Sequence, residues 1–266
     1  MSYSKRLASL VAARGRLCVG VDPHESLVRA WGADYDVAGI EWVSRHLVAA
    51  LGDQVAVFKP QAAFFERFGS AGVAALARLL ADISQTGALS LLDVKRGDIG
   101  STMAAYAQAY LSGTTDLSAD AITVSPFLGF GALAPAIELA NQTGRGVYVL
   151  CRTSNPEGGA VQQAEHQGRS VAQEIVDQAI MANAESGTDS VGLVIGGTLN
   201  SLNIDLTGFS GSILVPGIGA QGGTIDAVAG LFGAAAQLAL PSASREVMRA
   251  GPEEANLRAA VKALTW

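Results

Sequence analysis

The sequence predicts a (β/α)₈ barrel, and two observations support this. Eight apolar runs of strand length alternate with longer segments of helical periodicity along the 266-residue chain. These runs are continuously apolar, which is typical of parallel strands covered on both faces. We therefore expect residues 1–266 to form a single barrel domain, a common size for this fold. An open doubly wound sheet is the alternative. It is disfavoured because no Gly-x-Gly-x-x-Gly motif opens a first helix, and because eight repeats close naturally.

The expected elements follow one another without a linker-like stretch. Strands are expected over residues 17–21, 55–58, 88–94, 121–124, 146–150, 191–195, 212–215 and 236–240, which are short runs rich in Val, Leu and Ile. Helical periodicity covers, among others, residues 37–51, 71–86, 131–143, 169–186 and 224–233. A final helix is expected from Pro252 to residue 264, because proline is favoured in the first helical turn.

Composition limits the class of protein. The net charge of −6 and the pI near 5.1 argue against a general nucleic-acid surface. No apolar stretch reaches the roughly 18 residues of a membrane span, and residues 1–7 lack the apolar core of a signal peptide. Cys18 and Cys151 both lie in apolar, strand-like runs. Two buried thiols in a chain of this length favour a reducing compartment, so we expect a cytoplasmic protein.

Polar residues, glycine and proline follow the expected strands. The segments after strands one to eight are Asp22-Pro23, Lys59-Pro60, Asp93 to Lys95, Ser125-Pro126, Thr153-Ser154-Asn155, Gly196-Gly197-Thr198, Pro216-Gly217 and Ser242 to Arg245. Active sites of (β/α)₈ barrels lie at the carboxyl ends of the strands. A chance distribution would place polar residues equally at both ends, so this pattern indicates an enzyme.

The most informative segment is residues 91–102, Leu-Leu-Asp-Val-Lys-Arg-Gly-Asp-Ile-Gly-Ser-Thr. Asp93 and Lys95 are two residues apart at the end of a buried strand, so they should point to the same side. Asp98 follows within a turn. Two carboxylates around one ammonium group are expensive to desolvate, and stability alone rarely calls for them. The alternative is an ordinary salt bridge that closes a strand-to-helix turn.

A phosphate site is expected at the far end of the barrel. Residues 216–223 place four glycines between strand seven and its helix, which exposes backbone N–H groups to an anion. The loops after strands seven and eight are the usual phosphate site of this fold, and Arg245 can add a bidentate contact. A mobile glycine-rich loop is the alternative.

The histidines indicate neither a metal site nor a nucleophile. His24, His46 and His166 are scattered and lack the spacing of metal ligands, and no Ser-His-Asp arrangement or nucleotide-binding Walker motif is present. The chemistry therefore depends on carboxylates and ammonium groups.

These residues carry a resemblance to a known family. Residues 93–102 resemble the signature of orotidine 5′-phosphate decarboxylases, in particular of their longer bacterial subgroup. Val21-Asp22-Pro23, Phe58-Lys59-Pro60, Thr153 to Pro156, Pro216 to Gly223 and Arg245 fit in the expected order, so the resemblance runs from about residue 15 to 250. Ser125 stands where the family leads us to expect Asn. Ala243-Ser244 is an unusual approach to Arg245, which leaves the register of strand eight open.

The resemblance implies conversion of orotidine 5′-phosphate to UMP, the last step of pyrimidine nucleotide synthesis. Lys95 would donate the proton to carbon 6 of the pyrimidine as carbon dioxide leaves. Asp93 and Asp98 would flank Lys95, with Asp98 reaching in from the partner subunit of a homodimer.

The resemblance also assigns the residues that bind this nucleotide. Asp22 and Lys59 would bind the ribose hydroxyls, joined by Thr102 from the partner subunit. Ser154 would hydrogen-bond the pyrimidine, and Gln221 and Arg245 would hold the phosphate. No metal or organic cofactor is implied.

Two other functions remain open. A metal-assisted sugar-phosphate decarboxylase or aldolase of the same barrel superfamily would share the Asp-x-Lys-x-x-Asp core. It would be expected to carry a Glu/Asp-rich metal site at the strand ends, which the sequence does not show. A non-catalytic protein that binds a phosphorylated ligand is disfavoured because Lys95, Asp93 and Asp98 are all present.

Overall fold

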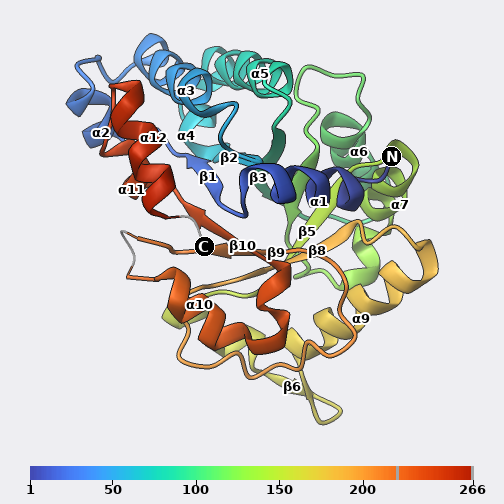
Figure 1. Ribbon diagram of the computed structural model, residues 1–266. Coiled ribbons are helices and arrows are strands. Elements are labelled where there is room, and N and C mark those ends of the chain that lie inside the picture. The colour runs from blue at the N-terminus through green and yellow to red at the C-terminus, as the bar shows by residue number, and fades with distance from the viewer. Residues whose placement is uncertain (220–221, 265–266) are drawn as a thin grey trace.

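Eight parallel strands close into a barrel with helices around it, as Figure 1 shows. The structure, a computed structural model, describes residues 1–219 and 222–264. Around the barrel the strand order is β1-β10-β9-β8-β5-β4-β3-β2, so each strand lies beside its neighbours along the chain. The strands β6 and β7 form a separate antiparallel hairpin that projects at the bottom of Figure 1. The predicted (β/α)₈ barrel is confirmed.

The elements have the following bounds. The barrel strands are β1 (Cys18–Val21), β2 (Val57–Pro60), β3 (Leu89–Arg96), β4 (Ala121–Val124), β5 (Gly146–Arg152), β8 (Val191–Ile195), β9 (Ile213–Pro216) and β10 (Ala239–Ala243). The longer helices are α1 (Tyr3–Arg14), α3 (Val37–Leu51), α5 (Gly69–Gln85), α6 (Gly100–Leu111), α7 (Ala134–Thr143), α9 (Val171–Ser186), α10 (Ile225–Phe232) and α12 (Glu254–Ala263). Short elements are α2 (Glu25–Ala30), α4 (Ala63–Glu66), α8 (Gly159–Gln162), α11 (Arg245–Met248), the hairpin strands β6 (Glu165–His166) and β7 (Arg169–Ser170), and the 3₁₀ turns η1 (Phe130–Leu133), η2 (Pro156–Gly158) and η3 (Gly233–Leu238).

Side-chain caps mark the starts of α3 and α10, which begin within one residue of the predicted positions. Asp36 accepts a hydrogen bond from the N–H of Gly39 at the start of α3, and Thr224 accepts one from Ala227 at the start of α10. Each bond satisfies one of the orphan N–H groups of a first helical turn. The last helix starts at Glu254 rather than at Pro252, so that predicted start is wrong by two residues.

Strand eight begins later than predicted. Residues 233–238 form η3, and β10 covers Ala239–Ala243. The predicted strand over 236–240 is therefore wrong at both ends, and Ser242 lies inside the strand rather than after it. The three consecutive alanines at 234–236 have a high helix propensity, which lets the chain continue from α10 as a 3₁₀ turn.

Three other strands extend two residues further toward the carboxyl end than predicted, and β9 extends one residue further. β2 reaches Pro60, β3 reaches Arg96 and β5 reaches Arg152. Lys59 and Lys95 therefore lie within strands rather than in the loops that follow. Their backbones belong to strands of the barrel, so the sheet, rather than a loop, fixes where these two side chains start.

The inside of the barrel changes from apolar to polar along its length. Side chains of alternate strand residues, such as Val57, Leu91, Ala121 and Leu240, form one buried apolar cluster inside the barrel. The inward positions two residues further along these strands are Lys59, Asp93, Thr123 and Ser242. A second and larger apolar cluster packs between the strands and the outer helices. The polar side chains are thus confined to the carboxyl ends of the strands.

Helix α1 closes the other end of the barrel (Figure 1). Tyr3 from this helix is 2% exposed and packs edge-on against Tyr148 of β5, with ring centroids 6.0 Å apart. The two hydroxyls hydrogen-bond at 3.0 Å, and the Tyr148 hydroxyl also hydrogen-bonds the Ser212 hydroxyl. This apolar end, with its satisfied hydroxyls, supports the barrel and lies opposite the polar end.

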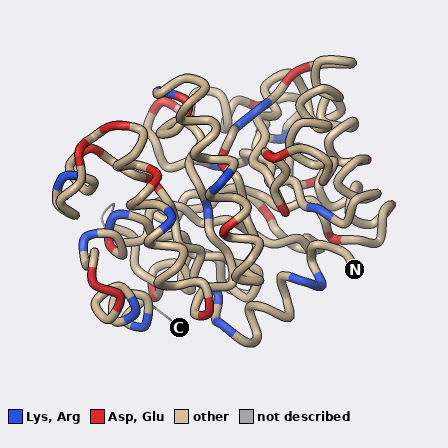
Figure 2. Tube along the Cα trace, turned by 90° about the horizontal axis from the view of Figure 1, so that it is seen from above, with Lys and Arg blue, Asp and Glu red and all other residues tan. Residues whose placement is uncertain are grey.

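The surface carries charges of both signs. Acidic and basic positions are interspersed over the molecule in the view of Figure 2. Within residues 1–219 and 222–264, no helix is long and apolar enough to cross a membrane.

The first prediction concerns the Tyr3–Tyr148 contact. Tyr3→Ala should lower the free energy of unfolding by about 3–5 kcal/mol, because it leaves a cavity beneath the barrel. Tyr3→Phe should lower it by only about 1 kcal/mol, since one hydrogen bond is lost while Tyr148 keeps Ser212. Urea unfolding measures both changes. Tyr35→Phe, which removes an exposed hydroxyl that accepts from Arg67, is the control and should be nearly neutral. Equal losses for Tyr3→Ala and Tyr3→Phe would contradict the packing role.

Candidate active site

A cavity of about 480 Å³ opens at the carboxyl ends of the strands. Six of the predicted site residues line it: Asp22, Lys59, Asp93, Lys95, Ser154 and Arg245. The structure therefore brings together side chains that lie up to 223 residues apart, from Asp22 to Arg245, in the sequence. A polar, concave site at this end of a barrel is where a substrate would bind.

Four charged groups, all of which line this cavity, form a row. The ammonium group of Lys95 lies 2.6 Å from Oδ1 of Asp93. The ammonium group of Lys59 lies 3.6 Å from Oδ2 of Asp93 and 3.7 Å from Oδ1 of Asp22. Lys59 and Asp93 are 6% and 8% exposed, whereas about half of the Lys95 side chain faces the cavity and solvent. The row alternates in charge, and Lys95 is its accessible end.

The row keeps its buried members ionised. Burial disfavours the ammonium form of Lys59, but the carboxylates of Asp22 and Asp93 outweigh it and raise the pKa of Lys59. Burial likewise favours a protonated Asp93, but Lys59 and Lys95 lower its pKa below the usual value. Both groups are therefore charged at neutral pH. Lys59 and Asp93 therefore act as fixed charges in the wall of the cavity.

Lys95 has an unusual backbone conformation. Its φ angle is +46°, a left-handed region that non-glycine residues rarely adopt. The register between β3 and β4 shifts between Leu92 and Arg96, and we call this irregularity of the ladder, which contains Lys95, the bulge. Bulges often redirect side chains at functional sites. The backbone N–H of Lys95 donates to Oγ1 of Thr123 at 3.0 Å, which holds this bulge.

Thr123 is a site residue that the sequence did not single out. Its hydroxyl donates to Oδ1 of Asp93 at 2.7 Å while accepting the Lys95 N–H, and it is 1% exposed. Threonine is common in strands, so Ala-Ile-Thr-Val reads as an ordinary buried strand. Its inward register at the polar end of β4 is the signal that could have identified it.

His24 also lines the cavity, although no role was predicted for it from the sequence. Its ring packs edge-on against Phe64 with centroids 4.4 Å apart. Partial burial lowers the pKa of His24, and the charge of Arg245 adds to this while Asp22 opposes it. At neutral pH the His24 ring is therefore uncharged, and it lines the same cavity as Arg245.

Two predicted residues, Asp98 and Thr102, do not line the cavity of this chain. Asp98 accepts a hydrogen bond from the N–H of Ile99 at 2.8 Å, and the Thr102 side chain is exposed in the first turn of α6. Neither lies against Lys95 within the chain. Gln221 lies outside the described residues.

The glycine-rich turn after β9 lies beside Arg245 at the cavity rim. Gly217 and Ile218 line the cavity, and Gly217 and Gly219 have φ angles of +104° and +77° that favour glycine. The N–H of Gly223 donates to the carbonyl of Gly217 at 3.0 Å, which curls the turn back on itself. Arg245 stands at the first position of α11, directly after β10. A guanidinium and a curled glycine turn at one rim suit an anionic group.

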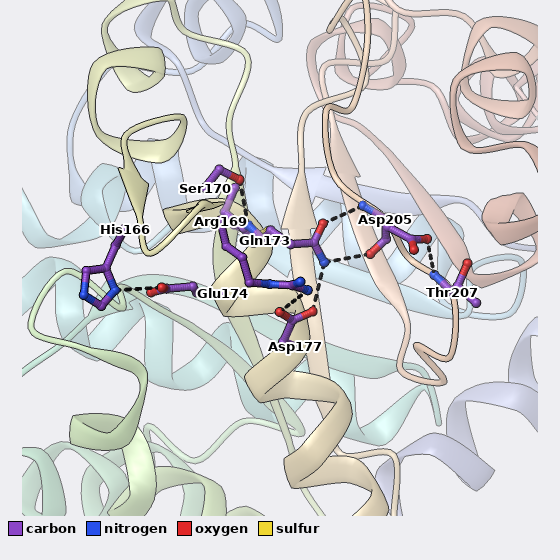
Figure 3. Close-up of polar contacts among 10 residues, drawn as sticks. His166, Arg169, Ser170, Gln173, Glu174, Asp177, Asp205 and Thr207 are labelled. Carbon is purple, nitrogen blue, oxygen red and sulfur yellow. Dashed lines mark hydrogen bonds and ion pairs between the residues drawn. The ribbon is translucent and has the colours of Figure 1, made fainter.

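The loop after β5 carries Ser154 and is tied to the neighbouring loop. Gln173 of α9 bonds the backbone of Asp205 twice, at 2.6 and 3.1 Å, and the pairs His166–Glu174 and Arg169–Asp177 tie the β6–β7 hairpin to α9 (Figure 3). These contacts fix the far end of the loop, whereas Ser154 itself is exposed.

Within residues 1–219 and 222–264, no group of three or more His, Cys, Asp or Glu side chains could hold a metal ion. The carboxylates in the cavity, Asp22 and Asp93, instead face the ammonium groups of lysines.

Comparisons with known proteins give one family for this chain. Residues 15–260 match the orotidine 5′-phosphate decarboxylase / HUMPS family. The orotidine 5′-phosphate decarboxylase of Salinispora arenicola is 53% identical over 97% of this chain and 94% of its own, and that of Streptomyces coelicolor is 50% identical over the same shares.

Solved structures agree with these relatives. A protein structure from Streptomyces avermitilis has a TM-score of 0.95 and 50% identity, covering 99% of this chain and 93% of its own. The OMP decarboxylase of Leishmania donovani has a TM-score of 0.78 and 30% identity, covering 100% and 96%. With one family matching nearly the whole length, the chain belongs to the orotidine 5′-phosphate decarboxylase / HUMPS family.

Proposed function

We propose that this carboxy-lyase converts orotidine 5′-phosphate to UMP in pyrimidine nucleotide synthesis, without a metal or an organic cofactor. The observation that carries the proposal is the ammonium group of Lys95, 2.6 Å from the buried Asp93 and accessible from the cavity. Relatives of about 50% identity over nearly the whole chain carry the decarboxylase name, which favours this reaction over a sugar-phosphate lyase.

The reaction explains why a fixed cation is needed. When the bond between carbon 6 and the carboxylate breaks, the electron pair stays on carbon 6 in the plane of the ring, where the π system cannot delocalise it. A cation placed before the reaction starts stabilises this charge without reorganisation. Lys95 then transfers a proton from Nζ to carbon 6, carbon dioxide leaves, and solvent reprotonates the lysine.

The other charged residues of the row have two roles in this proposal. Asp93 and Lys59 orient Lys95, and Asp22 binds a ribose hydroxyl. Asp93 anchors the Lys95 ammonium group, and Lys59 holds Asp93 ionised. Oδ1 of Asp22 is buried, and apart from its ion pair with Lys59 at 3.7 Å it has no hydrogen-bond partner among the described residues. A buried acceptor without a donor is costly, and a ribose hydroxyl would satisfy it.

Arg245 and the glycine turn support phosphate binding at the other rim, and Ser154 supports contact with the pyrimidine. A phosphate far from the reacting carbon can contribute binding energy that organises the site for the transition state. Gln221 is proposed to join Arg245 on the phosphate.

A homodimer with shared sites accounts for Asp98 and Thr102. Both follow β3, as does Ile99, which is 61% exposed, and the segment after the neighbouring strand β4 carries Phe127 and Leu128, which are 78% and 54% exposed. Exposed large apolar side chains of this kind suit a protein interface. A second copy seated here would bury them and could direct its Asp98 and Thr102 to this chain's Lys95.

A cytoplasmic location is part of the proposal. Cys18 and Cys151 are both free and buried, as expected for a protein kept under reducing conditions.

The second prediction tests the reaction and Lys95 together. Wild-type protein should decarboxylate orotidine 5′-phosphate with excess chelator present, measured as loss of pyrimidine absorbance. Lys95→Ala should abolish turnover while still binding UMP, because phosphate and ribose contacts remain.

Activity that the chelator removes would favour the metal-assisted alternative. Binding of the substrate without turnover by the wild type would favour a binding protein, and turnover of Lys95→Ala within about tenfold of wild type would remove Lys95 from the mechanism.

The third prediction concerns Arg245. Arg245→Ala should lower kcat/KM for orotidine 5′-phosphate by about 100-fold or more, because a charge-assisted bond to phosphate contributes about 3 kcal/mol. The slow turnover of orotidine, which lacks the phosphate, should hardly change. Gln221→Ala should show the same pattern to a smaller degree.

Arg249→Ala is the charge-matched control, since Arg249 is exposed one turn further on and does not line the cavity. If Arg245→Ala slowed both substrates equally, Arg245 would act on the pyrimidine end or on the fold.

The fourth prediction concerns the dimer. Lys95→Ala and Asp98→Ala homodimers should both be nearly inactive. A heterodimer of the two variants places both lesions in one site and leaves the other site intact, so it should recover about half of wild-type activity. Purification through two different tags isolates the heterodimer. A heterodimer as inactive as its parents would mean that Asp98 serves the Lys95 of its own chain.

A further inference from the structure

Arg96 is the one charged residue of segment 93–98 that the proposed mechanism leaves without a role. It follows Lys95 directly, ends β3, and contacts α4 and α6 rather than the cavity. We propose that Arg96 is a positioning residue, which locks the bulge at Lys95 and so aims the Lys95 ammonium group. The inference rests on the proposed function, because it assigns how the proton donor of that reaction is held.

The guanidinium of Arg96 is held on several sides. Its Nη2 forms an ion pair with Glu66 of α4 and donates to the hydroxyl of Tyr110 at 3.3 Å. The Cζ atom lies 5.7 Å from the ring centroid of Tyr106 and 5.9 Å from that of Tyr110. The two tyrosines are four residues apart and thus share one face of α6. We call Glu66, Tyr106 and Tyr110 the Arg96 cage.

The backbone on the other side is pressed against the end of β4. The carbonyl of Arg96 accepts from the N–H of Ser125 at 2.7 Å. A Cβ added to Gly97 would meet the Ser125 carbonyl oxygen at 2.4 Å, so the chain here lies closer to β4 than any other residue type allows. The Lys95 N–H is bonded to Thr123 from the same strand. β4 therefore fixes one side of the bulge, and the Arg96 cage fixes the other.

Such a lock is needed because of the Lys95 conformation. A lysine at a φ angle of +46° is strained, and strained backbone persists only where the surroundings over-determine it. Without the Arg96 cage, β3 could relax toward a regular strand beyond Val94. The Lys95 side chain would then leave its 2.6 Å contact with Asp93.

The cage also spans the turn that leads to α6. Arg96 ends β3, while Tyr106 and Tyr110 lie on α6, which begins at Gly100. The side-chain contacts thus bridge residues 97–99, the turn that carries Asp98. Arginine suits this task better than lysine, because its planar guanidinium can stack on aromatic rings while donating several hydrogen bonds.

The fifth prediction tests this role by separating turnover from binding. Arg96→Met should lower kcat about 10- to 100-fold, because a displacement of about 1 Å in a reacting group can reduce the rate by about that much. KM for orotidine 5′-phosphate and Kd for UMP should stay within about threefold of wild type, since the ribose and phosphate contacts are untouched. Arg96→Lys should fall between Arg96→Met and wild type. Tyr110→Phe, which removes only the hydroxyl, should lower kcat about two- to fivefold.

Arg78→Met is the matched control. Arg78 of α5 pairs with Glu41 of α3 at 2.6 Å on the outer surface, away from the cavity, and its loss should leave kcat unchanged. Thermal unfolding of each variant shows whether it is folded.

Four outcomes would overturn the inference. The first is a folded Arg96→Met protein with kcat within about twofold of wild type. The second is a loss of UMP affinity as large as the loss of kcat, which would indicate general disruption. The third applies if Arg96→Met does not fold: an unchanged kcat of the Tyr110→Phe variant would then overturn the positioning role of Arg96. A wild-type protein without decarboxylase activity would overturn the proposed function, and this inference with it.

Discussion

The carboxylate of Asp93 is the point on which the site depends, because two ammonium groups and one hydroxyl converge on it. Lys59 approaches one oxygen at 3.6 Å, while Lys95 and Thr123 approach the other at 2.6 and 2.7 Å. These four residues come from the three adjacent strands β2, β3 and β4. Closure of the barrel and correct register between these strands are therefore prerequisites for the arrangement, and a shift of one residue would turn a charged side chain into the outer apolar layer.

The charged row does not stabilise the fold in any simple way. Moving an ion out of water carries a penalty of several kcal/mol, and mutual attraction offsets it only when the geometry is good. The row has two carboxylates and two ammonium groups, so its charges balance. Stability must come from elsewhere, from the apolar layer around the strands and from the end closed by α1. Apolar packing thus supports the barrel around its strands and at the end closed by α1, and the charged groups lie at the opposite end.

Much of this arrangement could be predicted from the sequence, for identifiable reasons. Continuous apolar runs indicate a parallel barrel, and the carboxyl ends of parallel strands necessarily meet. Asp22, Lys59, Asp93 and Lys95 could therefore be grouped from their positions in the sequence alone. Arg245 could be grouped with them because its loop follows the last strand.

The features that sequence reasoning missed depend on contacts between elements. Thr123 reads as an ordinary strand residue, and only its inward register places it against Asp93. The start of β10 was misplaced because alanines 234–236 fit both an apolar strand and a helical turn, and packing decides between them. Nothing local in Val-Lys-Arg indicates a left-handed Lys95, because β4 and the Arg96 cage impose it from outside.

That left-handed backbone has an evolutionary consequence. Glycine adopts such a conformation without strain, whereas lysine does not. At position 95, glycine would therefore relieve the backbone strain that lysine causes, but it would remove the ammonium group. Under the proposed mechanism, selection for a more stable protein and selection for a faster one act in opposite directions on this residue. Compensation has to accumulate in the residues around it, so the neighbourhood of Lys95 should tolerate less sequence drift than its distance from the substrate alone would suggest.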